Sequence, residues 1–250
     1  MFGRFRETSC IAAALALACH SGSPGADDEA SLGESPNTGA STDASTSGVD
    51  ASTGDGACAP DDPLPSDAVL TTNGAVQGVT ADGVTHFLGI PYAAAPIGDL
   101  RWQPPQSPAC WSDVRAADVA APVCPQLTTA TGPITGDEDC LTLSVWTPDA
   151  SRDAARAVMV FIHGGGHTTG SGSDPLYDGA RLAATHDVVI VTIEYRLGAF
   201  GYLAHASLDD DDPRGSSGNY GLLDQLFALQ WVADNIAAFG GDPSNVTLFG

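Results

Sequence analysis

The chain contains no lysine, so its positive charge comes from nine arginines alone. Its 31 acidic residues outweigh them and give a formal net charge of −22. A surface this acidic repels the phosphates of nucleic acids and of anionic lipids, so nucleic acid is not an expected partner. The charge carries no information about the fold, and genome base composition explains the missing lysine more simply than function does.

Long apolar runs are also absent. The run near the N-terminus, Ile11–Ala18, is too short to span a bilayer as a helix. It follows a basic end and closes with small residues before Cys19, which is the pattern of an export signal over residues 1–19. The cysteine favours a bacterial lipoprotein signal in which Cys19 carries the lipid, and conventional cleavage near Ala18 is the alternative. The prediction is an exported protein, either attached to a membrane of the cell envelope through Cys19 or secreted.

Large apolar side chains are almost missing from residues 20–60. Ser, Thr, Gly, Ala and Asp dominate this stretch, which therefore buries too little surface to offset its chain entropy. We expect a disordered, solvated linker there, followed by a folded domain over residues 61–250.

No C-x-x-C or Cys/His spacing indicates zinc, and no other metal or cofactor is expected. Four cysteines remain beyond the signal region, and three pairings are possible. The shortest reasonable loop joins Cys124 to Cys140, and closing a loop of that size stabilises a fold by about 3 kcal/mol. Cys58 with Cys110 then follows by elimination. Disulfides are typical of an exported protein.

The folded part alternates predicted strands with predicted helices, which is typical of an α/β protein with a mostly parallel sheet. The strands are expected at Thr85–Ile90, Leu141–Trp146, Ala157–Ile162, Val188–Tyr195 and Val246–Phe249, after a hairpin at Val69–Val79. The alternating Leu141–Trp146 predicts one covered face. Ala157–Ile162 is continuously apolar, which is typical of a strand buried on both faces, and Val188–Tyr195 and Val246–Phe249 are expected as a second and a third buried strand.

Two helices are predicted, at Asp178–Thr185 and at Tyr220–Phe239. The second has helical spacing and should bury one apolar face. That face would consist of Leu222, Leu223, Leu226, Leu229, Val232 and Ile236.

Glycine motifs follow two of the predicted strands. His163-Gly164-Gly165-Gly166 is the oxyanion-hole motif of lipases and esterases, and its glycines let backbone N–H groups approach a substrate closely. A plain glycine-rich turn is the alternative. A phosphate loop is disfavoured, because no G-K-S/T follows and the spacing misses G-x-G-x-x-G. The other motif, Asn245–Gly250, resembles the start of a G-x-S-x-G nucleophile elbow without its serine.

The folded part resembles the type B carboxylesterases, the cholinesterase-like branch of the α/β-hydrolases. Matching runs follow one another in family order from about residue 65 to Gly250. They are Phe87–Ala93, Leu100–Pro105, Glu138–Leu141, Phe161–Gly166, Tyr195–Gly201 and Gly218–Gly250. Each run alone is weak, whereas the ordered set is highly specific. The resemblance implies the N-terminal part of an α/β-hydrolase, with a mixed, mostly parallel sheet, flanking helices and an N-terminal hairpin.

The resemblance also implies a serine hydrolase that cleaves small-molecule carboxylic esters. Gly165 and Gly166 would be the oxyanion donors, and the nucleophilic serine would come directly after Gly250, with the acid and the base later. We therefore expect these 250 residues to be inactive alone. The alternatives are a non-catalytic cholinesterase-like binding or adhesion module, and an incomplete gene product.

In the family, the positions of Arg196 and Asp224 form a pair. Those of Arg101 and Glu138 form another. We expect both pairs as buried, structural salt bridges. His163 is expected to be structural rather than the general base, because the catalytic His of the family lies later in the chain.

The sequence departs from the family pattern at several positions. His167 replaces the usual aromatic residue after the glycines, which would make the substrate pocket more polar. Glu194 replaces the usual Asn before Tyr195. The loop between the paired cysteines is short and has no Trp, so a choline ester is not an expected substrate. The acidic run Asp209–Asp212 suits Ca²⁺ in composition, but it lacks the EF-hand pattern and is expected to be a solvated loop.

Overall fold

A computed structural model of the chain describes residues 58, 60, 63–127, 129, 131–210, 212 and 214–250. The chain divides into two units, Met1–Ala51 and Ser52–Gly250, and every described residue belongs to the second. The predicted signal over residues 1–19 lies outside the described residues. The predicted linker over 20–60 lies outside them as well, apart from Cys58 and Pro60.

A six-stranded mixed sheet forms the centre of the second unit, in the order β11-β9-β10-β8-β4-β3. Its strands are β3 (Val79–Ala81), β4 (Val84–Pro91), β8 (Thr142–Thr147), β9 (Arg156–Ile162), β10 (Val189–Ile193) and β11 (Gly241–Phe249). The strands β9, β10 and β11 are parallel, whereas β8, β4 and β3 join by antiparallel pairing. The predicted mixed α/β architecture is confirmed.

Two small sheets accompany the main one. The predicted hairpin is formed by β1 (Ala68–Thr71) and β2 (Gly74–Gln77), and β5 (Arg115–Ala116) pairs with β2. A second hairpin joins β6 (Gln126–Leu127) to β7 (Ile134–Thr135).

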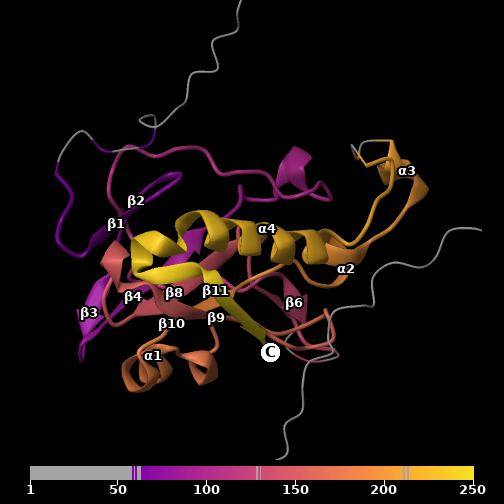
Figure 1. Ribbon diagram of the computed structural model, residues 1–250. Helices are drawn as coiled ribbons and strands as arrows, with labels where there is room; N and C mark the ends of the chain where they lie inside the picture. The colour runs from indigo at the N-terminus through magenta and orange to yellow at the C-terminus, as the bar shows by residue number, and fades with distance from the viewer. Residues whose placement is uncertain are drawn as a thin grey trace, which may run out of the picture. The chain divides into compact units, whose positions relative to one another are not determined.

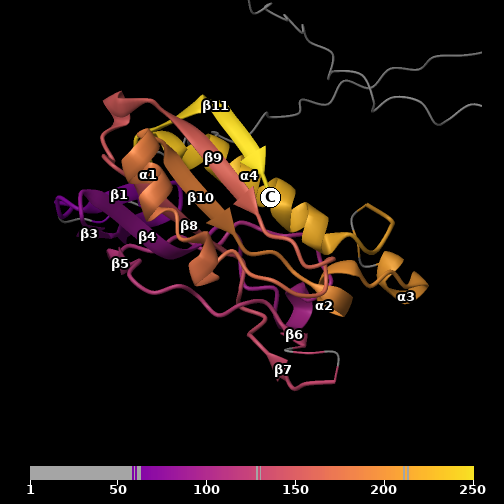
Figure 2. The same ribbon diagram turned by 90° about the horizontal axis from the view of Figure 1, so that it is seen from below.

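Helices cover both faces of the main sheet (Figures 1 and 2). The long helix α4 (Tyr220–Asn235) continues into η4 (Ile236–Phe239) on one face, and α1 (Ala180–His186) lies on the other. The shorter helical elements are η1 (Gly98–Leu100), η2 (Arg152–Ala154), η3 (Pro175–Tyr177), α2 (Gly198–Tyr202) and α3 (Ala206–Asp209). Among the described residues, no helix has the length and apolar character needed to cross a membrane.

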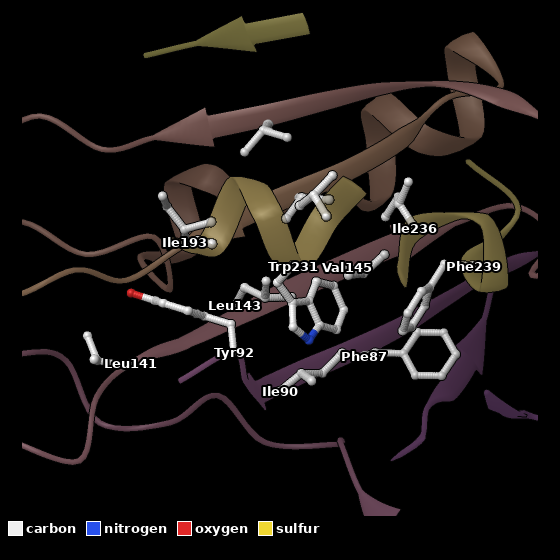
Figure 3. Packing of buried hydrophobic residues seen from close by; sticks show 14 of the residues in the cluster. Phe87, Ile90, Tyr92, Leu141, Leu143, Val145, Ile193, Trp231, Ile236 and Phe239 are labelled. Carbon is white, nitrogen blue, oxygen red and sulfur yellow. The ribbon is translucent and has the colours of Figure 1, made fainter. Parts of the chain in front are cut away.

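The core on the α4 face contains large apolar side chains from helix and sheet. Trp231 and Phe239 pack with Phe87 of β4 and Val145 of β8, and the rings of Phe87 and Phe239 meet edge to face at 4.9 Å (Figure 3). The next residue along β8, Trp146, packs on the opposite face with α1. The prediction of one covered face for β8 is therefore wrong, because α1 buries the second face as well.

The buried face of α4 also differs from the predicted one. Leu222 and Leu226 are 49% and 56% exposed. The buried residues of the helix are Tyr220, Gly221, Asp224, Ala228, Trp231, Val232 and Asn235. Asp224 points inward to bind Arg196, and the buried Trp231 lies on the same side about two turns later. Residues 222 and 226 follow the inward positions by about half a turn, so they face away from the sheet.

The strand β11 is an edge strand rather than a third strand buried on both faces. Its Leu248 is 52% exposed. Within the described residues β11 pairs only with β9, so nothing described covers its outer edge. The apolar run of Val246–Phe249 was correctly predicted as a strand, but burial depends on neighbours that lie on both sides of it.

Candidate functional site

The carboxyl ends of three parallel strands meet at one edge of the main sheet. The chain passes from β9 into His163, from β10 into Glu194 and from β11 into Gly250. Phe249 is in register with Phe161, so Gly250 lies beside Ile162 at the end of β9. Figure 2 shows the C-terminal residue next to the end of β9. In open α/β sheets, ligands bind at this edge.

A glycine-rich loop, residues 164–170, projects from that edge. Gly165 and Gly166 have φ of +117° and +60°. A Cβ at residue 165 would lie 1.9 Å from the carbonyl oxygen of Thr169, so only glycine fits there. The N–H groups of Thr168 and Thr169 both donate to the carbonyl of Gly165 at 3.2 Å. This turn fixes the conformation of the loop.

The N–H groups of Gly165 and Gly166 are free donors in this loop. Both glycines are exposed, and neither N–H donates to another described residue. Two adjacent N–H groups without partners can bind an oxyanion or a carbonyl oxygen. The structure therefore places the two residues predicted as oxyanion donors where a ligand can reach them.

His163, the residue directly before the loop, supports it from the buried side. Its ring is buried, stacks on Tyr195 with 4.3 Å between ring centroids, and contacts the carbonyl of Gly164 through Nδ1 at 2.9 Å. Because a carbonyl only accepts, Nδ1 carries the proton. Burial lowers the pKa of His163, which favours the neutral ring. A buried ring held on a backbone carbonyl suits a structural residue.

Gln126 holds the far end of the loop and was not found from the sequence. Its side-chain amide donates to the carbonyl of Gly170 at 2.8 Å and accepts from the N–H of Gly170 at 2.8 Å. The same amide nitrogen lies 3.1 Å from the carbonyl oxygen of Cys124. Gln126 thus ties the loop to the disulfide-bonded segment. No motif or spacing in the sequence marks it.

An apolar cavity of about 520 Å³ opens beside the loop. Thr168 and Thr169 line one side, and Phe200 of α2 lines another. Leu127 and Ile134 reach it from the β6/β7 hairpin. Such a cavity accommodates a small apolar group beside Thr168 and Thr169 of the loop.

His167, the predicted pocket residue, is exposed and does not line this cavity. Its ring stacks on Tyr202 with 4.7 Å between centroids, and its carbonyl accepts from the N–H of Gly198 at 2.7 Å. Burial raises the pKa of Tyr202 to about 12. A contact between His167 and a substrate stays a prediction.

The predicted charge pairs meet in the structure. The guanidinium of Arg196 donates twice to the carboxylate of Asp224, at 2.7 and 2.8 Å, and both side chains are buried. Arg101 donates to Glu138 with two bonds of 2.6 Å. This second pair is only half-buried, so the expectation of burial is wrong for it, because its arginine side chain lies at the surface and is 39% exposed.

The predicted cysteine pairs are also together. Cys124 is bonded to Cys140, with both residues fully buried, and Cys58 is bonded to Cys110. The first bond closes the segment that carries Gln126 and the β6/β7 hairpin. That segment forms one wall of the apolar cavity.

The acidic run is not simply a solvated loop. Asp212 is 4% exposed and forms an ion pair with Arg214, which lowers the pKa of the Asp212 carboxyl. Asp209 accepts bonds from the N–H and hydroxyl of Ser217. Asp211 lies outside the described residues. In the described part of the chain, no group of three or more Asp, Glu, His or Cys residues has a metal-binding arrangement.

The parallel strands, the glycine loop and the cavity at their carboxyl ends define the N-terminal part of an α/β-hydrolase of the carboxylesterase kind. The model of the Carboxylesterase family matches residues 65–250, and the chain belongs to that family. This confirms the resemblance drawn from the ordered motifs.

Known esterases match over the same region. The chain is 48% identical to a fumonisin B1 esterase of Sphingopyxis macrogoltabida over 183 residues, which are 72% of this chain and 34% of that protein. It is 46% identical to a para-nitrobenzyl esterase of Bacillus subtilis, covering 73% of this chain and 37% of that protein. A solved thermophilic PNB esterase superposes with a TM-score of 0.67 at 45% identity, over 74% of this chain and 38% of that structure. The chain thus spans about a third of the length of its curated relatives.

Proposed function

We propose that these residues form the N-terminal part of a serine-dependent carboxylic ester hydrolase. The observation that carries the proposal is the register of β11 on β9, which brings Gly250 beside the residue that precedes His163. A serine in an elbow after Gly250 would emerge next to the free N–H groups of Gly165 and Gly166.

The two donors suit the chemistry of acyl transfer. Negative charge develops on the carbonyl oxygen in the transition state, and loss of one donor typically costs about 2.7–4 kcal/mol. The serine would form an acyl intermediate that water then hydrolyses. The residues described here supply oxyanion donors and a pocket wall, while the nucleophile, acid and base would be supplied by sequence beyond Gly250.

The proposed substrates are small-molecule carboxylic esters. Support comes from the apolar cavity beside the loop and from relatives that are named for hydrolysis of para-nitrobenzyl esters and of fumonisin B1. The Cys124–Cys140 segment contains no Trp to hold a quaternary ammonium. A choline ester therefore remains an unexpected substrate.

We further propose that the protein is exported and that Cys19 carries a lipid. Two disulfides within the described residues suit an oxidising compartment. Mass spectrometry of the mature N-terminus tests the proposal. Lipidated Cys19 is the expected result, and an unmodified N-terminus near Ala18 would favour secretion instead.

The function is tested by translating the nucleotides that follow the Gly250 codon and expressing the extended protein. Glu-Ser-Ala-Gly next, with hydrolysis of para-nitrophenyl esters, is the expected result. A different residue in place of the serine, in a folded and inactive protein, would indicate a binding or adhesion module. An immediate stop codon would indicate an incomplete gene product.

A further inference from the structure

Glu194 is the unusual residue behind the glycine loop. It directly follows β10, is 1% exposed, and keeps its backbone in place through its N–H to the carbonyl of Thr142 at 2.9 Å. Its own backbone carbonyl accepts from the hydroxyl of Tyr92 at 2.7 Å. The backbone of Glu194 is therefore held in place, and its side chain is buried away from solvent.

One carboxyl oxygen of Glu194 anchors the segment that follows the loop. Oε1 accepts from the hydroxyl of Ser171 at 2.6 Å and from the N–H of Ser173 at 3.0 Å. Ser171 directly follows Gly170, the last residue of the loop. This oxygen therefore holds the segment that directly follows the loop.

The other carboxyl oxygen faces the ring of His163. Oε2 lies 3.9 Å from Nε2, and these two buried atoms have no hydrogen-bond partner among the described residues. The same ring supports both ends of the loop, because it holds the Gly164 carbonyl and leaves no space for a side chain at Gly170. A Cβ at residue 170 would lie 2.5 Å from Nδ1.

The facing atoms of His163 and Glu194 need one added proton to form a hydrogen bond. Nδ1 of His163 donates to a carbonyl, so Nε2 of a neutral ring is an acceptor. An ionised Glu194 offers only acceptors as well. Two facing acceptors in a dry interior would leave both atoms unsatisfied, whereas one added proton satisfies both.

We propose that Glu194 is a positioning residue of the glycine loop, whose protonated carboxyl group donates from Oε2 to Nε2 of His163. With that proton the two atoms approach by about 1 Å to hydrogen-bond distance. The carboxyl group then joins both sides of the loop, through His163 on one side and Ser171 on the other. Its positioning role in catalysis rests on the proposed esterase function.

The neighbouring groups leave Glu194 without a compensating cation. The ring of Tyr195 stacks on His163, the hydroxyl of Tyr92 donates to the backbone carbonyl of Glu194, and neither tyrosine is charged. Arg196 lies two residues away, but Asp224 from α4 neutralises it. Within the described residues, Glu194 forms an ion-pair contact with His163 alone.

Burial acts in the same direction on both partners. It raises the pKa of Glu194, against the opposing effect of the bonds from Ser171 and Ser173, and it lowers the pKa of His163. Both changes favour the neutral pair with the proton on the carboxyl group.

The proton held by this pair makes the folding stability depend on pH. Above about pH 6.5 an unfolded pair has lost both protons, since free Glu and His titrate near 4.3 and 6.5. The folded pair still holds one proton, so stability falls as the pH rises above that value until the folded pair releases it. In Glu194→Gln an amide N–H replaces the proton, and this loss of stability above pH 6.5 disappears.

Infrared spectroscopy of the extended protein in D2O tests the proton without any need for activity. A protonated carboxyl band is expected at pH 7 in the wild type and in the matched control Glu138→Gln, and it should be missing in Glu194→Gln. A spectrum at pH 7 in which Glu194→Gln removes only a carboxylate band would overturn the proposal.

Denaturation against pH provides the second measurement. Above pH 6.5 the ratio of the unfolding constants of wild type and Glu194→Gln should change by up to about tenfold per pH unit. A ratio that is independent of pH would contradict a proton held by Glu194.

Limited proteolysis and turnover test the positioning role. Glu194→Ala should be cleaved faster within residues 164–173 and should lose about 10²-fold in kcat, while Glu194→Gln restores both. Wild-type kcat should also decline at the alkaline pH where the protonated carboxyl band vanishes, and Glu194→Gln should show no such decline. Unchanged proteolysis in Glu194→Ala would contradict the positioning role. An extended protein without any ester hydrolysis would reject the proposed function but leave the infrared and proteolysis results decisive.

Discussion

Phe249 of β11 lies in register with Phe161 of β9, and their ring centroids are 5.2 Å apart. This contact aligns the ends of the two strands, one leading into the glycine loop and the other into Gly250. Parallel neighbours deliver successive loops to the same edge of a sheet. The proposed site depends on this alignment, since it brings the proposed nucleophile and the proposed oxyanion donors together.

The buried pair of Arg196 and Asp224 should be essential for stability. In Asp224→Ala the guanidinium stays buried without its carboxylate, and breaking a buried pair in this way costs about 3–5 kcal/mol. Asp234→Ala, on the exposed side of the same helix, should change the free energy of unfolding by about 0.5 kcal/mol or less. Urea denaturation of both variants checks this, and equal effects would contradict a special role for the buried pair.

The disulfide between Cys124 and Cys140 should stabilise the segment that lines the apolar cavity. Replacing both cysteines by alanine is expected to cost about 3 kcal/mol, because the loop becomes free in the unfolded chain. Peptide mapping without reduction should recover the two residues in one cross-linked fragment. Free thiols at both positions would show that the bond does not form.

The left-handed conformation at Gly165 should tolerate no side chain. Gly165→Ala brings a Cβ onto the carbonyl of Thr169 and should cost roughly 1–3 kcal/mol in stability, together with most of the ester turnover of an extended protein. Gly164→Ala is the matched control for folding, because nothing lies within 4 Å of a Cβ there. Thermal unfolding compares the two, and equal stability would argue against the loop conformation described above.

The edge strand β11 should limit the solubility of the 250-residue chain. An open apolar edge invites association with other chains, and a charge placed on it opposes this. Leu248→Lys should therefore raise the soluble concentration more than Leu222→Lys, whose leucine is equally exposed on a helix. Light scattering during refolding measures the difference. Equal behaviour of the two variants would mean that the edge is not responsible.

The sequence predicted most of the strands, the pairing of charges and the grouping of cysteines, because apolar runs and ordered family motifs are local signals. The prediction was wrong for the buried face of α4. Asp224 turns inward to bind Arg196, and this orientation of the helix leaves Leu222 and Leu226 exposed. The sequence missed Gln126, whose two bonds to Gly170 join positions 44 residues apart. Glu194 was visible as a departure from the family pattern, but its partners Ser171 and His163 emerge only when the strand ends are brought together.

Labelling by a serine-directed fluorophosphonate tests the central claim most directly. We expect the 250-residue chain to remain unlabelled and to hydrolyse no short acyl esters, because the proposed nucleophile, acid and base come after Gly250. A protein extended through the elbow should be labelled at a single serine just after Gly250 and should turn over para-nitrophenyl butyrate. Stoichiometric labelling of a serine within residues 1–250, accompanied by turnover, would contradict the account.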